Sequence, residues 1–179
     1  LTMAINIAFT LKMITEKYMK TDIVITGGGY VGLSTALMLA HLGLQVMIIE
    51  KNPLRLKKEK RGRLDEPSRL LAIAKASLEI YQRYNIKRLF EKRAEDITYI
   101  RVMEEATHSH LDFDPNEAGL LRFGVMIEEH FLLQNLYKNA TSYPNILFKY
   151  ETSIRSIIDE EELIKLALAD GTEIEAKLL

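Results

Sequence analysis

The sequence predicts an α/β fold in which a parallel sheet carries a helix on one face and a β-meander closes the chain. Short apolar, β-branched runs at residues 22–26 and 45–49 are typical of buried parallel strands. Residues 31–42 between them are apolar almost all round, as expected for a helix that packs on a sheet, and Gly43 is a natural stop. One strand–helix–strand unit of about 30 residues is therefore predicted.

The turn between the first strand and this helix carries the glycine spacing of a dinucleotide site. Gly27 permits a tight turn out of the strand, and Gly29 lets a pyrophosphate approach the backbone closely. Gly32 allows the helix to pack against the strand. The N–H groups around Tyr30 to Gly32 are then expected to point at the phosphates, aided by the helix dipole.

The second strand ends in a carboxylate that completes this pattern. Glu50 follows Gly32 by 18 residues and is placed to accept hydrogen bonds from ribose hydroxyls. A carboxylate there would repel a 2′-phosphate, which argues against NADP. The alternative, a glycine-rich turn that only connects strand to helix, leaves Glu50 and the glycines unexplained together. The pattern alone does not choose between NAD and FAD. The candidate cofactor-binding residues are Gly27, Gly28, Gly29, Tyr30, Val31, Gly32, Glu50 and Lys51.

The middle of the chain has patterns that predict short helices and short strands. Residues 75–84 have apolar positions at helical spacing. Residues 97–103 alternate imperfectly between apolar and polar side chains and predict a strand that pairs with residues 111–113 across a polar turn. Glu128 and Glu129 favour a helix start through the dipole. The remaining pieces are a basic loop at 51–66, an extended segment at 69–73, a turn of helix at 87–93, an apolar segment at 124–127 and a strand at 146–148.

The tail predicts the β-meander. Strand-like segments at 153–158, 163–168 and 174–179 are separated by two turns. The first turn is the acidic run at 159–162, and the second is Asp170-Gly171, a hairpin signal. We interpret residues 20–179 as one domain and residues 1–19 as an N-terminal extension to which the sequence assigns no function.

Composition excludes several classes of function. The 179 residues suit one domain, or one domain with part of another, and a net charge of −1 gives no reason to expect nucleic acid as a partner. The chain has no cysteine, which excludes disulfides, thiolate metal sites and a cysteine nucleophile, and fits a cytoplasmic location. No apolar run reaches the roughly 18 residues that cross a bilayer.

Other residue clusters favour ordinary surface roles. Acidic and histidine residues at 104–114 offer metal-ligand atoms, but a solvated hairpin tip explains them better, and no metal site is predicted. The basic stretch from Arg55 to Arg63 is interpreted as a surface loop, with peripheral contact to an anionic membrane as the alternative. No acid–base pair or triad stands out, so no catalytic residue is assigned.

Five stretches of the chain, in order, match the motifs of one family. Residues 22–50 resemble the N-terminus of the aromatic-ring flavin monooxygenases, above all the ubiquinone-biosynthesis hydroxylases of the 2-polyprenyl-6-methoxyphenol hydroxylase type. Residues 68–77 resemble that family's Arg-x-x-Ala-Leu segment, and residues 124–132 resemble its Gly-x-x-Val-Glu-Asn-Arg-x-Leu stretch. Residues 144–146 and 168–179 resemble its strand and meander.

The resemblance implies a cofactor, a reaction and one more site residue. It implies FAD as cofactor, with Arg69 near the FAD phosphates or ribose by position. It implies that NAD(P)H reduces the flavin and that dioxygen then hydroxylates an aromatic or quinone-precursor substrate. A substrate of that kind keeps peripheral contact with a membrane open for the basic stretch.

The chain departs from the family in two places. Glu129-His130 replaces the usual Asn-Arg, which weakens one expected FAD contact. The later Gly-Ala-Asp-Gly and Gly-Asp motifs are missing. We therefore expect a Rossmann-like FAD-binding domain that is incomplete: the N-terminal half of such a hydroxylase, inactive by itself. The alternatives are a decayed or split gene product that needs a second polypeptide to bind FAD, and an NAD-using oxidoreductase.

Overall fold

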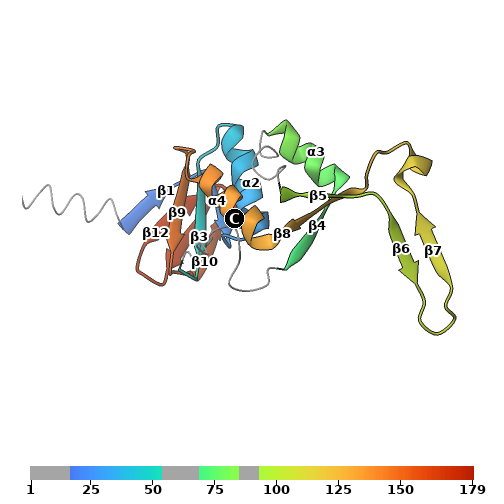
Figure 1. Cartoon of the computed structure of the whole chain (residues 1–179). Coiled ribbons are helices and arrows are strands. Elements are labelled where there is room, and N and C mark those ends of the chain that lie inside the picture. Colours follow the sequence, from blue (N-terminus) through green and yellow to red (C-terminus); the bar gives the residue numbers. More distant parts are fainter. Residues whose placement is uncertain (1–16, 54–68, 85–92) are drawn as a thin grey trace, which may run out of the picture. The chain divides into compact units, whose positions relative to one another are not determined.

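The computed structural model describes residues 17–53, 69–84 and 93–179, which fall into two compact units (Figure 1). The first unit contains residues 17–53 and 139–179, and the second contains residues 69–84 and 93–138. Most of the predicted extension, the basic stretch and the predicted turn of helix at 87–93 lie outside the described residues. The two units are described in turn.

A three-stranded parallel sheet forms the centre of the first unit. Its strands are β2 (Ile23–Thr26), β3 (Val46–Glu50) and β9 (Ile146–Tyr150), in the order β2-β3-β9. Helix α2 (Tyr30–His41) connects β2 to β3 and contacts all three strands. Residues 46–49 of β3 are almost fully buried, since both faces of this strand are covered. The predicted strand–helix–strand unit is confirmed.

The end of helix α2 is fixed by backbone geometry and one side chain. Gly43 has a φ of +87°, and its N–H donates to the carbonyl of Ala40 at 2.9 Å. A residue without a Cβ adopts this left-handed conformation at little cost, which explains why the helix stops there. The side-chain amide of Asn145 donates to the carbonyls of Ala40 and Leu44 at 2.9 and 2.8 Å. This contact ties the helix end to the start of β9.

The β-meander forms a second sheet against the parallel one. Strands β10 (Ile154–Glu160), β11 (Leu163–Leu168) and β12 (Glu173–Ala176) are antiparallel, and β1 (Tyr18–Lys20) adds to β12 in parallel. One face packs on the parallel sheet, and the shared core consists of Val24, Met47, Ile49, Leu166, Leu168, Ile174 and Ala176. The first unit therefore has three layers: a helix, a parallel sheet and a mainly antiparallel sheet.

Two boundaries in this sheet differ from the sequence interpretation. Strand β10 runs through Asp159 and Glu160, which were expected in a turn, because both residues pair with β11. Their side chains point to solvent at the open edge of the sheet, so an acidic strand end is tolerated. Strand β1 includes Tyr18 and Met19, which were placed in the extension. Met19 packs against the shared core, so this part of the chain has a structural role.

The second unit is built from antiparallel strands and short helices. Strands β4 (Leu70–Ala74), β8 (Gly124–Glu128) and β5 (Glu95–Ile97) form a sheet in the order β4-β8-β5. Helix α3 (Lys75–Arg83) follows β4, and helix α4 (Glu129–Ala140) begins directly after β8. Strands β6 (Ile100–Met103) and β7 (His110–Phe113) form a separate hairpin, followed by the 3₁₀ helix η3 (Pro115–Ala118).

One predicted strand is divided between two sheets. Residues 97–103 were expected to be continuous, but Ile97 ends β5, which pairs with β8, and Ile100 begins β6, which pairs with β7. The apolar positions change phase at the break, from Ile97 and Tyr99 to Ile100 and Val102, which the prediction of one continuous strand did not take into account. The pairing of this segment with residues 111–113 is confirmed for its second part.

Within the described ranges, no helix combines the length and apolar character required to cross a membrane.

Candidate functional site

The glycine turn has the geometry that its spacing predicts. Gly27 has a φ of +103°, a left-handed conformation, and its N–H donates to the carbonyl of Ile49 at 2.8 Å. A Cβ on Gly32 would lie 2.0 Å from the carbonyl oxygen of Gly27 and 3.3 Å from a methyl group of Ile25. Real Cβ atoms do not approach a backbone oxygen that closely. Gly27 is therefore required by its backbone angle, and Gly32 by the close packing of helix on strand.

The start of helix α2 is suited to hold an anion. Gly29 is the N-cap residue, so no side chain caps the helix, and its first turn contains no acidic residue. A Cβ built on Gly29 would meet nothing within 4 Å, so the space beside it is open. The N–H groups at Tyr30, Val31 and Gly32 belong to the first turn, where a helix offers no acceptor of its own. These amides and the helix dipole favour a phosphate at this position.

Glu50 is held in place beside this turn. Its Oε2 accepts a hydrogen bond from the N–H of Gly28 at 2.9 Å. Its Oε1 accepts two from Asn52, one from the backbone N–H at 2.8 Å and one from the side-chain amide at 2.9 Å. Burial acts to raise the pKa of Glu50, but the donors on Asn52 and Gly28 together outweigh it, so the pKa lies below its ordinary value. A fixed, ionised carboxylate therefore stands at the end of β3.

Two residues near Glu50 were missed by sequence reasoning. Asn52 orients the carboxylate, and no motif marks an asparagine two residues after a strand.

Thr152 lies beside the end of strand β3, with its N–H 3.4 Å from the carbonyl of Glu50. Its hydroxyl is buried, and no partner for it exists among the described residues. Glu151, just before it, has a φ of +55°, which is uncommon for a residue other than glycine.

The structure brings eight of the nine candidate residues together in the first unit. Lys51 follows Glu50 and is exposed. Arg69, the ninth, belongs to the second unit. Its Nη2 donates to Oε1 of Glu129 at 2.9 Å, and the N–H of Glu129 donates to the carbonyl of Arg69 at 2.8 Å. Glu129, which stands where the family has asparagine, therefore forms an ion pair with the arginine expected to contact FAD.

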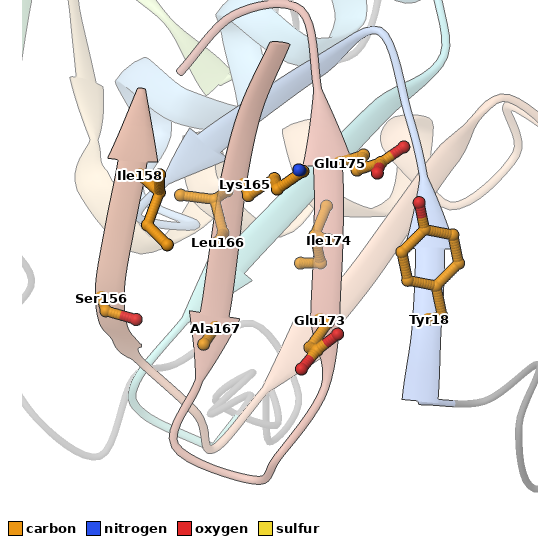
Figure 2. Close-up of a pocket in the computed structure, with 9 residues that line it drawn as sticks. All are labelled: Tyr18, Ser156, Ile158, Lys165, Leu166, Ala167, Glu173, Ile174 and Glu175. Atoms are coloured by element: carbon orange, nitrogen blue, oxygen red, sulfur yellow. The ribbon is translucent and has the colours of Figure 1, made fainter. Parts of the chain in front are cut away.

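A concave region lies on the outer face of the meander sheet. This pocket, of about 350 Å³, includes Tyr18 on β1, Lys165 on β11 and Glu175 on β12 (Figure 2). Glu175 is already paired with Lys20 at 2.8 Å, and this contact, with the hydroxyl of Tyr18, lowers the pKa of its carboxyl. None of the nine candidate residues lines the pocket. The glycine turn remains the better candidate for a ligand site.

No metal centre is found in the part of the chain that the structure describes. Groups of three or more histidine, aspartate or glutamate side chains with suitable geometry are absent from those residues. The acidic and histidine residues at 104–114 lie on the exposed hairpin β6–β7 and its turn. What the site offers chemically is phosphate and ribose binding by backbone amides and one carboxylate. This donor set fits the ADP half of FAD.

Comparisons with known proteins also indicate an FAD-binding protein. A model of the family described as FAD dependent oxidoreductase matches residues 22–115. The chain is 29% identical over 161 residues to 3-demethoxyubiquinol 3-hydroxylase of Escherichia coli (strain K12), covering 89% of this chain and 40% of that protein. It is 27% identical over 170 residues to ubiquinone hydroxylase UbiM of Neisseria meningitidis, covering 89% and 35%. The resemblance to ubiquinone-biosynthesis hydroxylases is confirmed. The chain spans only 35 to 40% of the length of these relatives.

Solved structures share the fold. The p-nitrophenol 4-monooxygenase PnpA from Pseudomonas putida superposes with a TM-score of 0.70 at 16% identity, covering 90% of this chain and 40% of that one. The flavin-dependent monooxygenase PieE, solved with FAD and substrate, gives a TM-score of 0.66 at 16% identity, covering 89% and 29%. At such identities the likeness concerns the fold alone. It confirms the predicted α/β class with parallel sheet and meander.

Proposed function

The chain belongs to the FAD-dependent oxidoreductase family, and on that premise we propose that it binds the ADP half of FAD at the turn Gly27–Gly32 and at Glu50. It would do so as part of an aromatic hydroxylase of the ubiquinone-biosynthesis type. The observation that carries the proposal is the uncapped start of α2 beside a carboxylate fixed by Gly28 and Asn52. Phosphates fit the amides, and ribose hydroxyls fit the carboxylate.

The residues of the site have distinct roles in this proposal. Gly29 leaves room for the pyrophosphate, and the amides of Tyr30 to Gly32 hold it. Glu50 accepts the ribose hydroxyls and repels a 2′-phosphate, while Lys51 adds positive charge beside it. Arg69 is proposed to contact FAD phosphate or ribose in place of its present partner Glu129. All of these groups bind and orient; none is assigned a catalytic step.

The reaction would come from the cofactor. When bound, FAD supplies electron transfer from NAD(P)H to dioxygen, one atom of which enters an aromatic or quinone-precursor ring as hydroxyl while the other leaves as water. The two curated relatives are named as hydroxylases of demethoxyubiquinol and ubiquinone type, which supports this substrate class. We place the protein in the cytoplasm, with peripheral contact to a membrane where such substrates reside.

A second candidate follows from the share of the relatives that the chain spans. The matched region spans 35 to 40% of such an enzyme, and in this second candidate a separate polypeptide completes the FAD site and surrounds the substrate. In that case this chain alone binds the adenosine part weakly or not at all, and it does not turn over substrate. The NAD-using alternative is the least favoured, since the matching family is one of FAD-dependent enzymes.

Equilibrium dialysis of the purified chain against FAD, ADP, NAD and 2′-phospho-ADP tests the proposal. We expect ADP and FAD to bind and 2′-phospho-ADP to bind more weakly. Retention of the flavin absorption band after dialysis would favour a site that the chain completes alone. ADP binding without retained flavin would favour the second candidate. A folded chain that binds neither ADP nor FAD would exclude the first candidate but not the second, which allows a chain that binds nothing until it is completed.

A further inference from the structure

Asn52 contacts Glu50 through its backbone and also through its side chain. Its backbone N–H donates to Oε1 of Glu50 at 2.8 Å, and its side-chain Nδ2 donates to the same oxygen at 2.9 Å. The other carboxylate oxygen, Oε2, accepts from the N–H of Gly28 at 2.9 Å. The backbone alone therefore provides one donor to each oxygen of Glu50. The side chain of Asn52 adds a donor that the orientation of the carboxylate does not require.

The three donors leave Glu50 with one position to accept a ligand. An ionised carboxylate has about four lone-pair positions, which are divided between its two oxygens. Asn52 occupies both positions on Oε1, and Gly28 occupies one on Oε2. The remaining position on Oε2 can accept one hydroxyl. The ribose of ADP presents a 2′ and a 3′ hydroxyl side by side, so Glu50 leaves one of them without an acceptor.

The side-chain amide of Asn52 carries a suitable second acceptor. Its Oδ1 belongs to the same planar amide as Nδ2, which the bond to Glu50 holds beside the carboxylate. No donor among the described residues bonds to Oδ1, and Asn52 is exposed, so this oxygen is open to a ligand. An amide oxygen accepts hydrogen bonds as a carboxylate oxygen does, but without its charge. Oε2 of Glu50 and Oδ1 of Asn52 thus offer two acceptors to two hydroxyls.

We propose that Glu50 and Asn52 divide the recognition of the ribose, with one hydroxyl donating to Oε2 of Glu50 and the other to Oδ1 of Asn52. This inference rests on the proposed function and adds a specificity-determining residue to the same site. Asn52 acts in two directions, as a donor to the carboxylate and as an acceptor from the ligand. The site therefore selects a ribose that has both hydroxyls over either deoxyribose.

Nucleotides that lack one hydroxyl test this division. ADP, 2′-deoxy-ADP and 3′-deoxy-ADP are each titrated into the isotope-labelled chain, and dissociation constants are taken from the backbone amide signals of Gly28 to Gly32. This readout also measures weak binding. We expect the wild type to bind each deoxy nucleotide roughly threefold to tenfold more weakly than ADP, the effect of one lost hydrogen bond. In Asn52→Ala this difference should vanish for one deoxy nucleotide and remain for the other, because Glu50 still accepts one hydroxyl.

Asn52→Asp is the matched variant, since it keeps the shape of the side chain and an oxygen acceptor but removes the amide donor to Glu50. It should retain the discrimination that Asn52→Ala loses. If Asn52 acted only by orienting Glu50, both variants would weaken the discrimination against both deoxy nucleotides together, and that result would overturn the inference. Discrimination that stays at its wild-type size in Asn52→Ala would overturn it as well.

The same titrations separate this inference from the site on which it rests. Wild-type chain that binds ADP and both deoxy nucleotides equally well would overturn the division of the ribose and leave the nucleotide site in place. Folded wild-type chain in which no glycine-turn signal responds to ADP would exclude the site in the chain by itself, and this inference with it.

Discussion

Strand β3 in the first unit and strand β6 in the second show how differently the two units use their side chains. Val46, Met47, Ile48 and Ile49 of β3 are at most 2% exposed, because α2 covers one face and the meander covers the other. Every residue of β6 and β7 is exposed. The first unit completes its own core and carries the proposed ligand site at its edge. The second unit leaves the hairpin β6–β7 exposed.

Substitution of Gly32 should give the largest effect. In Gly32→Ala the Cβ would lie 2.0 Å from the carbonyl oxygen of Gly27, so the helix must move away from the strand. We expect the free energy of unfolding to fall by about 1–3 kcal/mol, as for other overpacked sites, and ADP binding to be lost. Denaturant unfolding and equilibrium dialysis measure the two effects.

Gly28→Ala is the matched control for this change. Its Cβ would lie 3.5 Å from the Cβ of Glu50, an ordinary contact, and Gly28 does not have a positive φ. We expect little change in stability and retained ADP binding. Equal damage from both substitutions would show that the steric account of Gly32 is wrong.

Gly124→Ala should separate stability from ligand binding. A Cβ at this position in β8 would lie 2.1 Å from the carbonyl oxygen of Ile73, a clash as severe as that at Gly32. The clash lies in the second unit, so we expect a loss of stability of similar size, about 1–3 kcal/mol, with ADP affinity unchanged in the folded protein. Arg69 is the one proposed contact from the second unit, so loss of ADP binding by a folded variant would show that this unit contributes more than that single contact.

Glu50→Gln should change selectivity more than stability. The amide side chain keeps a similar shape but removes the charge that repels a 2′-phosphate, so the preference for ADP over 2′-phospho-ADP should shrink. Dialysis against both nucleotides measures this ratio. An unchanged ratio would show that Glu50 does not face the ribose.

Lowering the pH should reduce the difference in the free energy of unfolding between the wild type and Glu50→Gln. The folded-state pKa of Glu50 lies below its ordinary value, so its ionised form stabilises the fold above the unfolded-state pKa. That contribution declines as pH falls through the folded-state pKa. Unfolding curves of both proteins between neutral and acidic pH should therefore converge at low pH.

Asp112→Asn should give the smallest effect. Arg101 and Tyr99 lower the pKa of Asp112 well below its usual range, but the pair is on the surface and solvent screens it. We expect unchanged global stability and faster amide hydrogen exchange in β6 and β7 only. Exchange that also rises in the parallel sheet would show that the hairpin is coupled to the first unit.

The sequence predicted the first unit well for a physical reason. Its nucleotide motif lies within one strand–helix–strand unit, which contains the spaced glycines, the apolar helix and Glu50. Within such a unit, residues close together in the sequence determine the geometry. The end of helix α2 at Gly43 and the turn at Gly171, with a φ of +83°, follow from backbone angles that favour glycine.

The features that were missed depend on contacts between distant residues. Asn145 and Thr152 reach the sheet from far along the chain, and no local pattern predicts the contacts that they make. The division of residues 97–103 between two sheets depends on which partner strand each part finds. The pairing of β1 with β12 likewise joins the two ends of the chain. The ion pair between Arg69 and Glu129 spans 60 residues and was not foreseen.

The most direct test of the account is a nuclear magnetic resonance titration of the isotope-labelled chain with ADP. The account predicts that the backbone amide signals of Gly28 to Gly32 and of Asn52 shift saturably, while the signals of β6 and β7 stay in place. A folded chain whose glycine-turn signals do not move at saturating ADP would contradict the claim that the first unit holds the nucleotide site.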